Sequence, residues 1–169
     1  KGAIIMLDPF QRMNSANAAL SIKPSEDGQI NSIDDLLGFY GLHFSRNKVV
    51  GDFESAATVE SSTGRNFSYP YWLQIKDKNI SREHIVSDKL KELLFAEAGF
   101  FETNKQNIKT QPIVLTSDET NLLAKSDVRE KSTETLATEF QITNDIRKVI
   151  ALHLSGQLDS PYVQTKSEI

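Results

Sequence analysis

The sequence contains no cysteine among its 169 residues. This absence excludes disulfide bonds, zinc sites built from thiolates and catalysis by a cysteine nucleophile. The sequence also lacks any apolar run near the roughly 20 residues that a membrane-spanning helix needs. Acidic residues outnumber basic residues by 23 to 19, which gives a net charge of −4. Without an excess of positive charge to neutralise phosphates, we expect no nucleic-acid partner and no polybasic membrane surface.

Recognisable catalytic and cofactor motifs are missing as well. The eight glycines follow no spacing that is typical of a dinucleotide fingerprint or a phosphate-binding loop. There is no Gly-x-Ser-x-Gly nucleophile elbow. The three histidines, His43, His84 and His153, lie far apart and outside any His-Glu-x-x-His motif. We therefore predict no metal site, no cofactor and no enzymatic activity.

Short apolar runs are separated by polar or helical segments along the chain. The run Ala3–Leu7 is continuous and apolar, which is typical of a strand buried on both faces in a parallel sheet. A helix is predicted from Ser32, which would be its N-cap, with Gly41 at its C-terminal cap. The next short buried strand is at residues 48–50, so that strand, helix and strand would form a parallel crossover unit.

Two later regions have more particular features. Residues 67–75 are aromatic and alternating, which predicts a strand, and Pro70 within it indicates an edge position or a bulge. Residues 87–98 fit either a helix or a strand. The polar residues 117–145 favour a short helix flanked by loops.

Asp8 and Asp52 each close a predicted parallel strand. The carboxyl ends of strands in open α/β sheets line a ligand crevice, so the two carboxylates would face one crevice beneath a loop over residues 9–31. They could bind a metal or a hydroxylated ligand, or each could cap its own turn through backbone amides. We favour a structural role for Asp8, because Pro9 fixes the turn after it. We expect Asp52 to be the freer carboxylate, and Asp8→Ala to destabilise the chain more than Asp52→Ala.

The densest aromatic cluster is Tyr69-Pro70-Tyr71-Trp72. Exposed tyrosine and tryptophan rings would form a platform for a sugar or a peptide. Alternatively, alternate rings fill the core, because only one face of a strand can point outward; we favour this second interpretation. The candidate ligand-binding residues are Asp8, Asp52, Tyr69, Tyr71 and Trp72.

Six stretches, taken in order, carry a resemblance to a known family. They are Gly2–Pro9, Ile33–Leu42, Asn47–Asp52, Tyr69–Trp72, Thr110–Ser117 and Val149–Ser160. Together they resemble the GldG family, auxiliary components of ABC-type transport systems that are linked in some bacteria to gliding motility.

The resemblance implies a single extracytoplasmic α/β domain over residues 1–169, cut from a longer protein that membrane helices anchor. The implied fold is a mainly parallel sheet sandwiched by helices, flavodoxin-like or glutamine-amidotransferase-like but without the catalytic cysteine. It also favours strands at residues 92–97 and 148–155. The predicted strands of the parallel core sheet are then Ile4–Leu7, Lys48–Val50, Leu93–Ala96, Ile113–Thr116 and Val149–Leu154.

The function implied is that of a non-enzymatic module acting through protein contacts. Its partners would be the membrane and ATPase subunits of an ABC transporter, at the periplasmic or extracytoplasmic face of the bacterial inner membrane. The alternative is a carbohydrate- or glycan-binding domain. A third hypothesis, a hydrolase with Asp8 and Asp52 around a metal, is the least favoured, because no nucleophile or base motif accompanies them.

Overall fold

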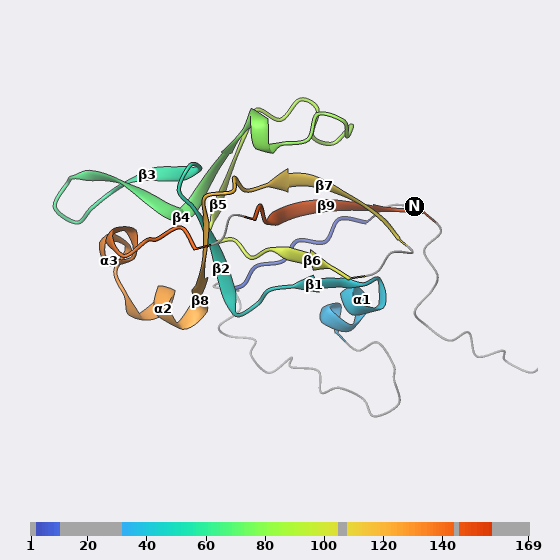
Figure 1. Ribbon diagram of the computed structural model, residues 1–169, viewed down its shortest axis with the longest axis horizontal. Coiled ribbons are helices and arrows are strands. Elements are labelled where there is room, and N and C mark those ends of the chain that lie inside the picture. Colours follow the sequence, from blue (N-terminus) through green and yellow to red (C-terminus); the bar gives the residue numbers. More distant parts are fainter. Residues whose placement is uncertain (1–2, 11–31, 105–107, 144–145, 157–169) are drawn as a thin grey trace, which may run out of the picture.

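The computed structural model describes residues 3–10, 32–104, 108–143 and 146–156 of the chain (Figure 1). In this part of the chain strands (41%) far outweigh helices (17%). In chain order the elements are α1 (Ile33–Phe39), β1 (Leu42–Phe44), β2 (Lys48–Asp52), β3 (Ala56–Glu60), β4 (Asn66–Lys76), the 3-10 helix η3 (Asp77–Asn79), β5 (Glu92–Ala96), β6 (Phe101–Thr103), β7 (Lys109–Leu115), β8 (Thr120–Ala124), α2 (Lys125–Glu130), α3 (Thr133–Thr138) and β9 (Val149–Ser155).

The strands form three antiparallel sheets (Figure 1). One sheet has the order β1-β6-β9-β7, another has the order β3-β4-β5, and β2 pairs with β8. Each pairing described between these strands is antiparallel. The prediction of a mainly parallel, flavodoxin-like or glutamine-amidotransferase-like α/β sandwich is therefore wrong. The described α-helices have six or seven residues, about 10 Å of length, which is too short to cover a sheet as a crossover helix does.

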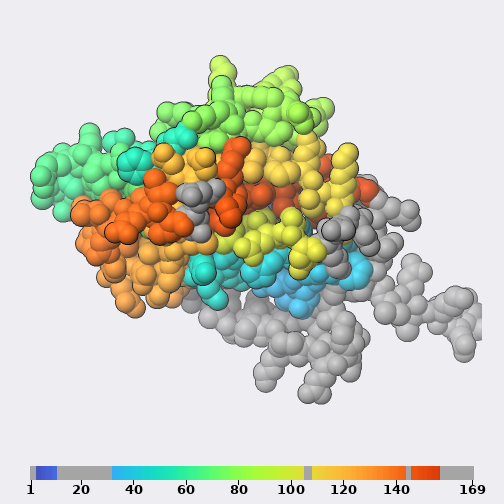
Figure 2. Space-filling model, viewed as in Figure 1, coloured from blue at the N-terminus to red at the C-terminus, as the bar shows by residue number. Residues whose placement is uncertain are grey.

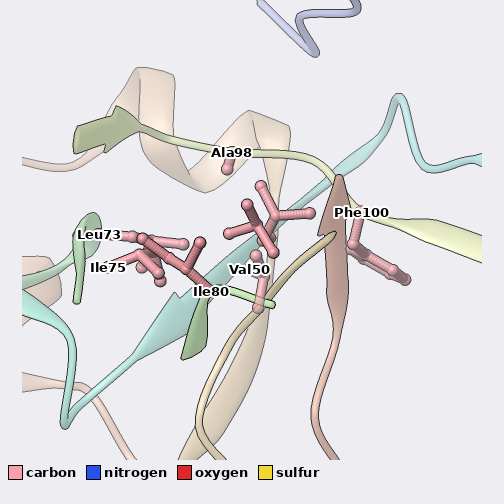
Figure 3. Packing of buried hydrophobic residues seen from close by; sticks show 8 residues of the cluster. Val50, Leu73, Ile75, Ile80, Ala98 and Phe100 are labelled. Carbon is pink, nitrogen blue, oxygen red and sulfur yellow. The ribbon is translucent and has the colours of Figure 1, made fainter. Parts of the chain in front are cut away.

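The three sheets share a central cluster of buried side chains (Figure 3). Its members are Val50, Leu73, Ile75, Ile80, Ala98, Phe100, Val114 and Ile150. A second group, here the Tyr71 cluster, comprises Phe10, Val49, Tyr69, Tyr71 and Leu136. A third, the Leu42 cluster, comprises Leu37, Leu42 and Phe44.

Strand β2 lies between two of these clusters. Its neighbouring residues Val49 and Val50 are fully buried and belong to different clusters, because successive side chains of a strand point to opposite faces. Val49 and Val50 confirm the expectation of a short buried strand at this position. Its neighbour Gly51 is also confined, since a Cβ atom there would lie 2.7 Å from ring atoms of both Phe140 and Tyr71.

Residues 3–7, predicted to open the sheet as a buried strand, form no strand. Ile4 and Met6 are each 91% exposed. Only the end of the segment is anchored: Leu7 packs against the Leu42 cluster, and Phe10 is buried in the Tyr71 cluster. The predicted crossover unit is therefore wrong, because its first strand does not form.

The predicted helix after Ser32 is confirmed as α1, and its capping box explains where it begins. The backbone N–H of Asp35 donates to the Ser32 hydroxyl (3.1 Å), and the backbone N–H of Ser32 donates to the Asp35 carboxylate (3.1 Å). Gly41 follows with a φ of 70°, the left-handed conformation expected after a helix C-terminus.

Strands predicted at residues 48–50, 67–75, 93–96, 113–116 and 149–154 correspond to β2, β4, β5, β7 and β9. Pro70 occupies a bulge, as the sequence suggested, and not an edge strand. The pairing of β3 with β4 jumps from Ala57 opposite Tyr69 to Ala56 opposite Leu73, so that β4 accommodates a proline although it is the middle strand of its sheet.

None of the described helices is long and apolar enough to cross a membrane.

Candidate functional site

Asp52 ends β2 and is fully buried. Its Oδ1 accepts hydrogen bonds from the Ser117 hydroxyl (2.6 Å) and the Ser55 backbone N–H (3.2 Å). Its Oδ2 accepts one from the Ser117 backbone N–H (2.7 Å). These donors replace the water that a buried carboxylate loses. Asp52 therefore fastens the end of β2 to the turn after β7, and the expectation that it is the freer carboxylate is wrong.

The turn after β7 is also bonded to the start of β9. The Thr116 hydroxyl accepts a hydrogen bond from the Lys148 backbone N–H (2.7 Å), and Arg147 Nε donates to the Thr116 carbonyl (2.8 Å). Arg147 Nη2 also donates to Asn79 Oδ1 (2.8 Å). We call the set Asp52, Ser55, Thr116, Ser117 and Arg147 the Asp52 network. Its members lie at the ends of four strands, β2, β3, β7 and β9, which belong to all three sheets, so the network stabilises the packing of the sheets.

The Asp52 network offers little for catalysis. The Ser117 hydroxyl donates to Asp52 and accepts from the Glu119 backbone N–H (3.1 Å). A carboxylate that already accepts three hydrogen bonds keeps few lone pairs for a metal or for the proton of a nucleophile. The arrangement therefore gives no support to the hydrolase hypothesis.

Asp8 has a different environment. Its side chain is exposed, and Oδ1 accepts a hydrogen bond from the Phe10 backbone N–H (2.7 Å). This is a local turn in which an aspartate bonds the backbone two residues on. None of the described hydrogen bonds or ion pairs connects Asp8 with Asp52. Most of the loop over residues 9–31 that was expected to roof the two carboxylates lies outside the described residues.

The aromatic residues of β4 fill the interior. Tyr69 and Tyr71 are 1% and 2% exposed, whereas Trp72 is half-buried. The Tyr71 ring lies edge-on to Tyr69 and to Phe140, with ring centroids 5.8 Å and 5.6 Å apart. Alternate rings therefore occupy the core, the interpretation favoured from the sequence. A ligand role for Asp8, Asp52, Tyr69, Tyr71 and Trp72 stays a prediction.

Burial also changes the acidity of Tyr71. It raises the pKa of the phenol to about 12, with smaller contributions from the negative charges of Asp127 and Glu139. The neutral phenol is favoured because the ionised form would lose its hydration inside the Tyr71 cluster. This side chain is therefore a structural phenol that stays protonated at physiological pH.

A surface feature that the sequence did not reveal surrounds the start of β8. Phe53, Ile142 and Ile146 are exposed by 57%, 47% and 65%. The Phe53 ring stacks on that of Phe140 with a centroid distance of 6.2 Å. We call Phe53, Phe140, Ile142 and Ile146 the Phe53 patch. Exposed apolar side chains that gather in one region are typical of a surface that contacts another protein.

Hydrogen bonds to β8 bring the segments of the Phe53 patch together. The Phe53 backbone N–H donates to the Glu119 carbonyl (3.0 Å), and the Thr143 N–H donates to the Thr120 carbonyl (3.0 Å). The Thr120 hydroxyl donates to the Ile146 carbonyl (3.3 Å). In Figure 2 the orange surface turned towards the viewer contains the segment around residue 142. The sequence alone does not distinguish Phe53 from an aromatic residue of the core. Its exposure follows from the position of its segment beside Glu119 and Phe140, which are distant in the sequence.

In the described part of the chain, no group of three or more histidine, aspartate or glutamate side chains is placed to hold a metal ion.

Comparison with known proteins identifies a family. The model of the family described as "ABC-type uncharacterized transport system" covers residues 1–168. No curated protein and no solved structure matches the chain.

Proposed function

Because the chain belongs to the family of auxiliary components of ABC-type transport systems, we propose that it is a non-enzymatic, extracytoplasmic domain that works by contacting other subunits of such a system. The observation that carries this proposal is the family match over residues 1–168. The ordered resemblance to the GldG family supports the finer assignments: membrane helices outside this sequence that tether the domain, a position at the outer face of the bacterial inner membrane, and a link to gliding motility.

The absence of assembled catalytic groups in the described residues supports a non-enzymatic role. The carboxylate with the most enclosed environment, Asp52, is occupied by hydrogen bonds from Ser55 and Ser117. Asp8 is exposed and engaged by its own turn. Catalysis by paired carboxylates would require both groups to face the same reacting atoms, and these two have separate partners, Phe10 for Asp8 and Ser55 and Ser117 for Asp52.

We assign the contact with the transporter's membrane subunit to the Phe53 patch. Aromatic side chains are enriched at the centre of protein interfaces, where they contribute a large part of the binding free energy. The Phe53 ring already rests on Phe140, so little conformational freedom is lost when a partner covers it. Asp118 and Glu119 border the patch on the β8 side and would make its rim acidic.

Co-purification tests this proposal. The full-length protein is extracted from native membranes with a mild detergent, captured through a tag, and the associated proteins are identified. We expect ABC transporter subunits in the eluate, and we expect Phe53→Ser to reduce their recovery at least about tenfold, as the loss of a central aromatic contact would. Phe39→Ser is the matched control, because Phe39 is an exposed phenylalanine (38%) on α1.

The outcomes distinguish a failure of the proposed function from a failure of the assigned contact surface. If wild-type protein recovers no transporter subunit, the proposed function is wrong. If wild type and Phe53→Ser recover equal amounts, the function stands and the Phe53 patch is not the contact surface.

The lack of cysteine permits a direct test of the extracytoplasmic location. Ser126→Cys places a thiol on exposed α2 with almost no change in side-chain shape, and the protein without this substitution is the labelling control for any thiol outside the 169 residues. A membrane-impermeant maleimide should label this variant in intact cells or spheroplasts. Labelling that occurs only after lysis would place the domain in the cytoplasm and contradict the proposal.

Glycan binding, the alternative function, has weaker support. The predicted platform would need exposed rings, whereas Tyr69 and Tyr71 are buried and only Trp72 of the three retains partial exposure. Binding to a glycan array that Trp72→Ala abolishes would favour this alternative over a role limited to protein contacts.

A further inference from the structure

Two histidines that are distant in the sequence lie in contact. The ring centroids of His84 and His153 are 4.4 Å apart, and their planes are inclined by 52°. His153 belongs to β9, and His84 belongs to the segment at residues 81–91, here the 81–91 loop. Both side chains are half-buried.

The alternation of β9 explains which face carries His153. Its neighbours Leu152 and Leu154 pack against the Leu42 cluster, so His153 points to the opposite face of the sheet. The start of the 81–91 loop is fixed to β7, since the Ser81 backbone N–H donates to the Ile113 carbonyl (2.8 Å). In Figure 1 the loop, drawn in green, leaves the end of β4 on the side of β7.

The backbone around His84 is held by hydrogen bonds within the loop. Ser87 is fully buried; its hydroxyl donates to the Ser81 carbonyl (2.7 Å), and its N–H donates to the His84 carbonyl (2.9 Å). The His84 ring is therefore presented to β9 by an ordered turn. Its contact with His153 joins the tip of the loop to the sheet.

The contact between the two rings is more stable when both imidazoles are neutral than when they are protonated. The Val86 backbone N–H donates to His84 Nδ1 (3.2 Å), so this nitrogen accepts a hydrogen bond and carries no proton. Protonation would place an Nδ1–H against the Val86 N–H. Protonation of both rings would also place two positive charges about 4.4 Å apart.

Other charged side chains lie on the elements around the pair. The loop carries Arg82, Glu83, Asp88, Lys89 and Lys91, the 3-10 helix before it carries Asp77 and Lys78, β7 carries Lys109, and β6, which pairs with β9, carries Glu102, whose carboxylate lies near His43. None of the described ion pairs involves His84 or His153, and Asp77 is paired with Arg82. No described carboxylate is thus paired with either ring to stabilise its charged form.

We propose that His84 and His153 form a pH-sensitive latch: the neutral rings hold the 81–91 loop on the sheet, and protonation releases it. The latch is closed while both rings are neutral and opens when acid adds protons to them. The loop tip carries Ile85 and Val86, exposed by 86% and 64%, so release would reposition an apolar pair. The inference rests on the fold and does not depend on the proposed function.

Hydrogen exchange of the 169-residue chain tests the latch. Amides of the 81–91 loop are compared with those of β4 at about pH 7.5 and about pH 5.5, after correction for the intrinsic pH dependence of exchange. We expect protection of the loop, relative to β4, to fall at least about tenfold in the acidic sample. The double variant His84→Phe/His153→Phe retains two aromatic rings that cannot gain charge, and its loop should stay protected to within about twofold.

His43→Phe is the control, because His43 is an exposed histidine on β1 that lies near Glu102; this variant should respond to pH like wild type. If the double variant lowers the protection of the whole chain, His84→Gln replaces it, with the same expectation of a loop insensitive to pH. The proposal is overturned if the wild-type loop keeps its protection in acid. It is equally overturned if the variants without the pair lose protection as wild type does.

Discussion

Replacing Asp52 with alanine removes an acceptor that three buried or partly buried donors share. A hydrogen bond to a charged group contributes about 1.5–3 kcal/mol, and a buried donor without an acceptor costs about 1–3 kcal/mol. The three contributions do not add, because Ser117 supplies two of the donors and all three converge on one carboxylate. By analogy with the disruption of buried ion pairs, we expect Asp52→Ala to lower the free energy of unfolding by about 3–5 kcal/mol.

Two further variants calibrate this loss. Asp8→Ala removes one hydrogen bond at an exposed side chain, so it should cost only about 0.5–1 kcal/mol. Asp52→Asn keeps the shape of the side chain but turns an amide N–H₂ towards one of the donors from Ser117. We expect it to cost roughly 2 kcal/mol, the penalty for one donor left unpaired.

Urea unfolding monitored by circular dichroism and tryptophan fluorescence measures these differences as shifts of the midpoint at constant slope. A double-mutant cycle with Ser117→Ala tests whether the Ser117 hydroxyl accounts for the loss. Asp52→Ala should lower the free energy of unfolding much less when the Ser117 hydroxyl is already absent. If Asp52→Ala does not fold, Asp52→Asn still reports the effect. A cost for Asp8→Ala that equals or exceeds the cost for Asp52→Ala would refute the assignment of roles.

Three more predictions concern Tyr71 and two glycines. Burial raises the pKa of the Tyr71 phenol in the folded chain to about 12. Below pH 10 the phenol is neutral in both the folded and the unfolded chain, so the full stability of the fold is present. As the pH rises from 10 towards 12 the unfolded phenol ionises first, and the free energy of unfolding falls by about 2 kcal/mol. Urea midpoints at alkaline pH should show it in wild type and not in Tyr71→Phe, and an equal loss in both would contradict the assignment. Gly51→Ala should lower the stability by about 1–3 kcal/mol, because its Cβ would lie 2.7 Å from the Phe140 ring. Gly38→Ala on α1, where nothing lies within 4 Å of the new Cβ, should instead raise the free energy of unfolding by up to about 1 kcal/mol. A higher melting temperature would show this gain.

The burial of β2 could be predicted from the sequence, but the direction of its partner could not. A short continuous apolar run such as Val49-Val50 has side chains on both faces of the strand, so both faces must be covered. This requirement is the same for parallel and antiparallel neighbours. The partner, β8, is an antiparallel strand in a segment whose polar neighbours suggested a helix with loops. Strand direction follows from the path of the whole chain, which a local pattern does not contain.

Local rules succeeded where the interaction itself is local. The capping box joins Ser32 and Asp35, three positions apart. The missing N–H of Pro70 limited that residue to an edge strand or a bulge, and the bulge is the one that forms. The run at residues 3–7 shows the limit of such rules. Hydrophobicity predicted burial there, but a strand needs a neighbour, and Ile4 and Met6 are almost completely exposed. Short strands of three residues, such as β1 and β6, offer too few positions for a recognisable alternation.

Asp8 and Asp52 show that local rules predict only local interactions at the candidate site as well. Each follows a short apolar run in the sequence, so local rules predict similar environments for both. The structure gives Asp8 a partner two residues away, the Phe10 N–H, and gives Asp52 two donors from the distant Ser117. The first partner is set by the turn that Asp8 itself begins. The second exists only because the ends of β2 and β7 meet, so the buried role of Asp52 depends on the tertiary fold and not on its neighbours in the sequence.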